Sequence, residues 1–133
     1  MRKEVWEILE EINTDPSAIS KYKDNSMLRL VLKNNFLEEY KWLLPDGNPP
    51  YKESNLPEGM SPNSLYQECT RFYTLRRTDL KSIKREAIFI NMLQSVDPKE
   101  AKILLAIKDQ ELSKLYPNVT RDSVKEILDV TQS

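Results

Sequence analysis

The most concentrated chemistry in this sequence is cationic. Between positions 71 and 85 the chain places six basic residues against a single acid, Asp79, so this window carries a net charge of +5 and the rest of the chain carries −6. The six are Arg71, Arg76, Arg77, Lys81, Lys84 and Arg85. Clustered cations suit phosphates, because each contact with a nucleic-acid backbone releases a condensed counterion. The pattern predicts a nucleic-acid-binding patch, and the alternative is that these cations pair with acids elsewhere in the chain.

The spacing of these residues favours one helix face. Lys81, Lys84 and Arg85 follow an i, i+3, i+4 pattern, which brings side chains together on a helix. Arg76 and Arg77 stand just before the expected start, where Asp79 is a candidate cap. We therefore expect four or five cations within about two turns. The apolar side expected for this helix is formed by Leu80, Ile83, Ala87, Ile88, Ile90 and Leu93.

Several aromatic residues could stack on bases, but their helical spacing is more typical of a core. They are Trp6, Tyr40, Trp42, Phe72 and Tyr73. Tyr51 is different, because it lies inside the segment 45–62, which contains five prolines and both glycines of the chain. Such a segment forms a long loop. Tyr51 either packs under this loop or faces a protein partner, and the sequence does not decide between the two.

The chain lacks most catalytic equipment. It contains no histidine, which excludes Ser-His-Asp and Cys-His catalysis and histidine-bound zinc. Two glycines are too few for a phosphate-cradling loop. One cysteine, Cys69, excludes an intrachain disulfide and a multi-cysteine metal site, and its spacing from Leu65 and Phe72 predicts a small buried hydrophobe. We predict that the protein is not an enzyme and has no cofactor and no metal.

Acidic residues could still be imagined as acid/base pairs or metal ligands. Glu10–Glu11 and Glu38–Glu39 are the obvious pairs, but adjacent residues on a helix do not face each other. A solvated surface is the simpler interpretation. A carboxylate-bound metal hydrolase remains the formal enzymatic alternative, and metal in the purified protein would support it.

The elements that must position these side chains are predicted to be helices. Val5, Ile8, Leu9 and Ile12 form one buried stripe at helical spacing. Asn34-Asn35 should interrupt or kink a later helix. Helix starts are indicated by capping or cap-and-proline signals at Asp15-Pro16, Asp24, Ser61-Pro62, Asp97-Pro98 and Thr120. No strand pattern appears, so we predict an all-α, compact single-domain bundle of six to eight helices over residues 1–133.

Length and composition agree with that prediction. The chain has 133 residues, of which 39% are hydrophobic and 31% charged, which is the profile of one globular domain. No apolar run approaches the ~20 residues that span a bilayer. The opening stretch MRKEVWEILEEI alternates acidic and apolar residues and is unlike a secretory signal. We expect a cytoplasmic protein without membrane contact.

Two stretches of the chain have a distinctive pattern: VWEILEEIN followed by K-x-K-D-N-x-x-L-x-x-V, and DPKEAKILLAIKDQELSKLYPNVTRDSVKEIL with its Lys108-Asp109 pair. Both resemble the N-terminal helical DNA-binding domain of ATP-dependent DNA ligases from large tailed phages. The matched positions of the first are Lys21, Lys23, Asp24, Asn25, Leu28 and Val31. WLLPDGNPPYK, SPNSLYQECTRFY and LKSIKREAIFINML resemble small stand-alone phage proteins without an assigned function. The resemblance implies an all-helical domain that grips a duplex through its backbone.

The departures from the ligases limit what this resemblance implies. No K-x-D-G motif surrounds Gly47 or Gly59, and no nucleotidyltransferase or OB domain is present, so ligation is excluded. We therefore expect a non-catalytic accessory protein of a phage, in the host cytoplasm, which contacts double-stranded DNA. The second hypothesis is an adaptor that binds a phage or host protein through the Pro-rich loop and Tyr51. The oligomeric state is left open.

Overall fold

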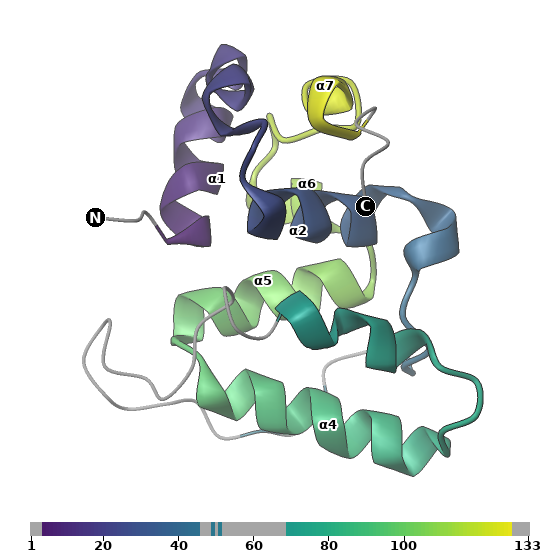
Figure 1. The fold of residues 1–133 in the computed structure, drawn as a ribbon. Coiled ribbons are helices and arrows are strands. Elements are labelled where there is room, and N and C mark those ends of the chain that lie inside the picture. The colour runs from purple at the N-terminus through teal and green to yellow at the C-terminus, as the bar shows by residue number, and fades with distance from the viewer. Residues whose placement is uncertain (1–3, 46–48, 50, 52–68, 129–133) are drawn as a thin grey trace.

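The computed structural model describes residues 4–45, 49, 51 and 69–128, and this part of the chain is helical and contains no strand (Figure 1). It confirms the prediction of an all-α bundle. The α-helices are α1 (Val5–Thr14), α2 (Ser26–Phe36), α4 (Ser82–Ser95), α5 (Pro98–Lys108), α6 (Leu112–Leu115) and α7 (Lys125–Leu128). Three 3₁₀ helices accompany them, η1 (Pro16–Tyr22), η2 (Glu38–Tyr40) and η3 (Cys69–Arg76).

Helix α1 forms where the hydrophobic spacing predicts it. Val5, Ile8, Leu9 and Ile12 are all buried. A capping box formed by Glu4 and Glu7 starts the helix. The Glu4 side chain accepts from the backbone N–H of Glu7, and the Glu7 side chain accepts from the backbone N–H of Glu4 at 3.0 Å. The outer face of α1 carries the acids, so the helix is amphipathic and packs with one face only.

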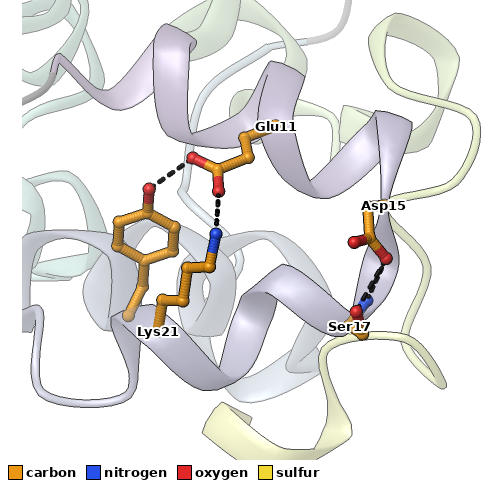
Figure 2. A network of polar contacts seen from close by, with 5 residues as sticks. Glu11, Asp15, Ser17 and Lys21 are labelled. Carbon is orange, nitrogen blue, oxygen red and sulfur yellow. Dashed lines mark hydrogen bonds and ion pairs between the residues drawn. The ribbon is translucent and has the colours of Figure 1, made fainter.

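A polar network joins α1 to η1 (Figure 2). The predicted cap Asp15 is confirmed, since its carboxylate accepts from the backbone N–H and the hydroxyl of Ser17, at 3.2 and 2.7 Å. Glu11 accepts from the ammonium of Lys21 at 3.0 Å and from the hydroxyl of Tyr22. These contacts fold η1 back along α1.

The other predicted caps have different outcomes. Asp24 was wrongly expected to cap α2, because the next residue, Asn25, caps it by accepting from the N–H of Leu28 at 3.0 Å. Asp97 occupies the cap position of α5 before Pro98, although its side chain makes no capping hydrogen bond. Thr120 and Ser123 exchange side-chain to backbone bonds of 2.8 and 3.2 Å in the turn before α7, but the helix begins only at Lys125, so Thr120 was wrongly expected to cap it.

Asn34 and Asn35 do not interrupt α2, which was wrongly expected, because both side chains find partners inside the protein. Asn34 and Asn35 are buried, and α2 continues to Phe36. The indole N–H of Trp42 donates to Oδ1 of Asn34 at 2.8 Å, and Oδ1 of Asn35 accepts from the N–H of Leu112 at 3.0 Å. The two amides therefore stitch α2 to the segments that follow it.

One hydrophobic cluster lies between the helices. Helix α5 crosses the middle of the molecule, with α2 on one side and α4 on the other (Figure 1). Trp42 is buried against the rings of Phe72 and Phe89, with ring centroids 5.0 and 5.7 Å apart. These three aromatic residues fix η3 and α4 against the segment that follows η2.

Leu93 is buried as predicted, but the rest of the buried face of α4 differs from the predicted one. Phe89, Met92 and Leu93 are its buried residues, whereas Ile83 is 72% exposed and Ala87 is exposed. Both sets follow helical spacing, so periodicity alone could not choose between them. The bulkier set faces the core, because it removes more apolar area from water.

Most of the Pro-rich loop at 45–62 lies outside the described residues. So do the predicted cap at Ser61, the helix position Leu65 and the side chain of Cys69. Tyr51 is described, and it is partly buried and packs against the hydrophobic cluster. In the described part of the chain no helix is long and apolar enough to cross a bilayer.

Candidate nucleic-acid interface

The six predicted cations, Arg71, Arg76, Arg77, Lys81, Lys84 and Arg85, lie on η3, on the connection 77–81 and on the first turn of α4. We call this region the basic corner. It is joined to the segment after η2 by a backbone hydrogen bond from Leu43 N–H to the carbonyl of Leu75, at 2.9 Å. Each of the six has a different environment, and these environments decide which of them are open to a ligand.

Arg85 holds the corner together. Its Nε donates to the carbonyl of Leu43 at 3.0 Å, and its Nη1 donates to the carbonyls of Arg77 and Leu80 at 2.9 and 2.5 Å. One guanidinium thus fixes both the connection before α4 and the segment after η2. The predicted phosphate contact at Arg85 competes with these three bonds, so its role in the structure is to position the surface.

Arg77 is neutralised by its neighbour. Its guanidinium makes a two-bond ion pair with the Asp79 carboxylate, whose first bond, Nε to Oδ1, is 2.9 Å long. The hydrogen bond from Arg77 lowers the pKa of Asp79, and the same bond raises the pKa of Arg77. Asp79 is therefore not the cap of α4, as was wrongly expected. Lys81 occupies that position without a capping side-chain bond.

Arg76 is positioned by an aromatic ring. Its guanidinium lies 4.5 Å from the centroid of Tyr40, and its Nε is shielded from solvent without a hydrogen-bond partner. A cation over a ring keeps its charge while its orientation is restricted. Arg71 is partly buried and makes an interaction of its own, so it does not count among the open cations.

Lys81 and Lys84 are exposed at the start of α4. The carbonyl of Lys81 accepts from the N–H groups of Lys84 and Arg85, which begins the helix. Neither ammonium group pairs with a carboxylate in the described part of the chain. Together with Arg76, these lysines are the cations of the corner that bind neither a described acid nor, as Arg85 does, described backbone carbonyls.

The five aromatic residues considered as base-stacking candidates also differ in their exposure to solvent. Trp42 and Phe72 are buried, as predicted for a core. Tyr40 lies under Arg76, and Trp6 is partly buried with the ammonium of Lys99 at 3.8 Å from its ring centroid. Tyr73 was wrongly expected in the core, because its side chain is 56% exposed. Its predecessor Phe72 fills the core position instead.

Two small pockets lie away from the corner. One of about 320 Å³ is lined by Leu37, Arg121, Asp122, Lys125 and Leu128, and one of about 220 Å³ by Glu10, Lys99, Lys102, Leu115 and Tyr116. Both mix acidic and basic groups. Burial, with a smaller effect of Glu10, raises the pKa of Tyr116 to about 12. No cluster of three or more metal-ligating side chains occurs among the residues whose structure is described.

Apart from the exposed Asp24, the polar residues that carry the ligase resemblance make contacts within the protein. Lys21 pairs with Glu11, Lys23 pairs with Glu126, and Asn25 caps α2. Lys108 is buried, and its ammonium donates to the carbonyl of Pro45 at 2.9 Å and to Asp109 at 2.6 Å. These motif residues hold the helices in place, so they are not candidates for the surface that meets a ligand.

Comparison with known proteins identifies a family whose function is unknown. The model of a family of unknown function, DUF6433, matches residues 9–114, which is well over half of the chain and includes the basic corner. No curated protein and no solved structure matches the chain.

Proposed function

We propose that this chain, which belongs to DUF6433, a family of unknown function, is a non-catalytic nucleic-acid-binding accessory protein. It contacts the backbone of duplex DNA through the basic corner. The observation that carries the proposal is the set of three cations, Arg76, Lys81 and Lys84, that are bound neither to an acid nor to a backbone carbonyl in the described residues. The resemblance to ligase DNA-binding domains supports the same role in a phage.

Charge distribution supports this surface over others. The window from 71 to 85 carries +5, whereas the rest of the chain carries −6 and repels a polyanion. Even with Arg77 neutralised by Asp79, the corner keeps a strong positive excess. A phosphate backbone would therefore be attracted to one side of the molecule, and the acids elsewhere would orient its approach.

The six cations have separate tasks in this proposal. Lys81 and Lys84 contact phosphates as mobile ammonium groups, and Arg76 does so from a fixed position over Tyr40. Arg85 keeps the connection 77–81 in place by binding three carbonyls. Contacts of this kind position a duplex without reading its sequence, so the expected binding is strongly salt-dependent and weakly sequence-dependent.

Fluorescence anisotropy with labelled duplex DNA tests the proposal. At low salt the natural protein should bind, and the double variant Lys81→Glu, Lys84→Glu should lose about tenfold or more in affinity. The matched control is Lys102→Glu with Lys125→Glu, which makes the same charge change at exposed lysines of α5 and α7. Absence of binding by the natural protein, or an equal loss in both double variants, would contradict the proposal.

The adaptor hypothesis receives less support from the geometry. Its anchor, Tyr51, packs partly buried against the hydrophobic cluster instead of standing clear of the surface. The remaining Pro-rich residues of that loop fall outside the described part, apart from Pro45 and Pro49. Binding of a phage or host protein through this loop stays a prediction, and recovery of a partner after deletion of residues 48–57 would count against it.

A further inference from the structure

Among the residues that the structure describes, the large exposed apolar side chains are concentrated at the basic corner. In the described part of the chain four large hydrophobic residues are exposed, and three of them are Leu43, Tyr73 and Ile83, at 42, 56 and 72%. They lie on the three segments that build the corner, namely the segment after η2, η3 and the first turn of α4. The fourth, Leu115, lies on α6.

Hydrogen bonds connect these three segments to each other. Leu43 donates to the carbonyl of Leu75 on η3 and accepts from Arg85 on α4, at 2.9 and 3.0 Å. Tyr73 lies on η3 three residues before Arg76, and side chains at this spacing share one face of a 3₁₀ helix. Ile83 stands between the exposed lysines Lys81 and Lys84 in sequence. Exposed apolar and cationic side chains therefore lie on the same three hydrogen-bonded segments.

Contact with a duplex backbone would engage the cations of the basic corner but not its exposed apolar side chains. The outside of a duplex offers phosphates and sugars, while the faces of its bases are stacked away from the protein. Phosphates of such a partner can pair with the cations, but the exposed Tyr and Ile side chains would bury little apolar area against it. Unpaired nucleotides offer phosphates together with free base faces, and an aromatic ring beside cations is the usual platform for them.

We propose that the basic corner binds unpaired nucleotides next to a duplex, with the ring of Tyr73 stacking on a base and Ile83 and Leu43 covering its edges. This inference rests on the proposed DNA-binding function and specifies its substrate as a junction between duplex and single strand. Lys81, Lys84 and Arg76 contact phosphates on the duplex side. Stacking tolerates every base, so no sequence preference is expected.

Three fluorescent probes of matched length test this inference by anisotropy: a blunt duplex, the same duplex with a thymidine overhang, and the overhang strand alone. The natural protein should bind the overhang probe about fivefold or more tighter than the blunt duplex. Tyr73→Ala should remove this preference and leave the blunt-duplex affinity unchanged, and Tyr73→Phe should keep it. Leu115→Ala, at the exposed hydrophobe outside the corner, should change nothing, and circular dichroism checks the fold of each variant.

The outcomes separate this inference from the function on which it rests. Equal binding of blunt and overhang probes by the natural protein would overturn the junction and leave duplex binding standing. An overhang preference that survives Tyr73→Ala would also overturn the assigned platform. Loss of binding to all three probes would remove the proposed function itself, and the exposed hydrophobes would then belong to a protein-binding surface.

Discussion

The guanidinium of Arg85 donates to the carbonyl of Leu43, 42 positions earlier in the chain, at 3.0 Å. This bond ties the first turn of α4 to the segment that follows η2. Because the same guanidinium also holds the carbonyls of Arg77 and Leu80, one side chain determines the shape of the basic corner. Arg85, which the sequence predicts to bind phosphate, therefore acts mainly to hold in place the segments that carry the neighbouring cations.

Replacing Arg85 should lower stability. We expect Arg85→Ala to reduce the free energy of unfolding by about 1–3 kcal/mol, because carbonyls that accept from a charged donor lose their partner. Arg85→Lys should recover little, since one ammonium cannot reproduce the forked donors that reach three carbonyls. Urea denaturation measures both values.

Lys84→Ala is the matched control for Arg85, because the two neighbours are one position apart and Lys84 is exposed. Its free energy of unfolding should stay within about 0.5 kcal/mol of the natural protein. If Arg85→Ala were as stable as Lys84→Ala, the three carbonyl bonds would not stabilise the corner, and Arg85 would again be a candidate for phosphate contact.

The salt dependence of DNA binding should identify the contacting lysines. With Lys81→Gln and Lys84→Gln together, the slope of log affinity against log salt concentration should become shallower by about two, because each lysine releases about one counterion. Anisotropy titrations over a series of salt concentrations measure this slope. Arg77→Gln should leave it nearly unchanged, because the Asp79 carboxylate already neutralises Arg77. A slope that responds to Arg77 and not to the lysines would contradict this assignment.

Helix positions follow from local sequence, and this part of the fold was predictable. The buried stripe of α1 and the cap at Asp15 need only neighbouring residues, and both appear as predicted. At α4 the sequence offers two apolar stripes, and the core selects Phe89 and Met92 over Ile83. That choice depends on what α5 and η3 present to the helix, which no local pattern contains.

The cations could be found from sequence, but their partners could not. Arg85 meets a carbonyl 42 residues away, and Lys108 meets the carbonyl of Pro45, 63 residues away. Every residue has a backbone carbonyl, so the sequence does not indicate which basic residues bind carbonyls and which remain open to a ligand. The ion pair between Arg77 and Asp79 could have been predicted from the sequence, because the two residues have opposite charges and lie two positions apart in the same connection.

The buried bond between Trp42 and Asn34 should contribute to stability. Asn34→Leu leaves the indole N–H without an acceptor and should cost about 1–3 kcal/mol. Trp42→Phe removes the donor, and the double variant should be less destabilised than the sum of the two single variants. A double-mutant cycle from urea denaturation measures the coupling energy, expected near 1 kcal/mol. A coupling energy of zero would mean that the bond adds nothing beyond packing.

Acid should release the contact between η1 and α7. Hydrogen bonds from Lys23 and Ser20 lower the pKa of Glu126 below its ordinary value of 4.5. A lowered carboxyl pKa adds stability above the unfolded-state value, and this stability is lost as the pH falls through the folded-state value. Glu126→Gln should therefore be slightly less stable than the natural protein at neutral pH and equal to it in strong acid. A difference that persists below that range would point to packing instead of charge.

Alkali should affect Tyr116 later than a free tyrosine. Burial, together with the nearby Glu10 carboxylate, raises the pKa of its phenol from 10.0 to about 12. A raised folded-state pKa means that the stability is fully present below the unfolded-state value and is lost as the pH rises from 10 towards 12. Thermal unfolding over this range should show a decline that Tyr116→Phe lacks. Phenolate absorbance of the folded protein should also contain a late-titrating component, which Tyr116→Phe removes and Glu10→Gln shifts to lower pH. A titration curve unchanged by Tyr116→Phe in this late region would contradict the assignment.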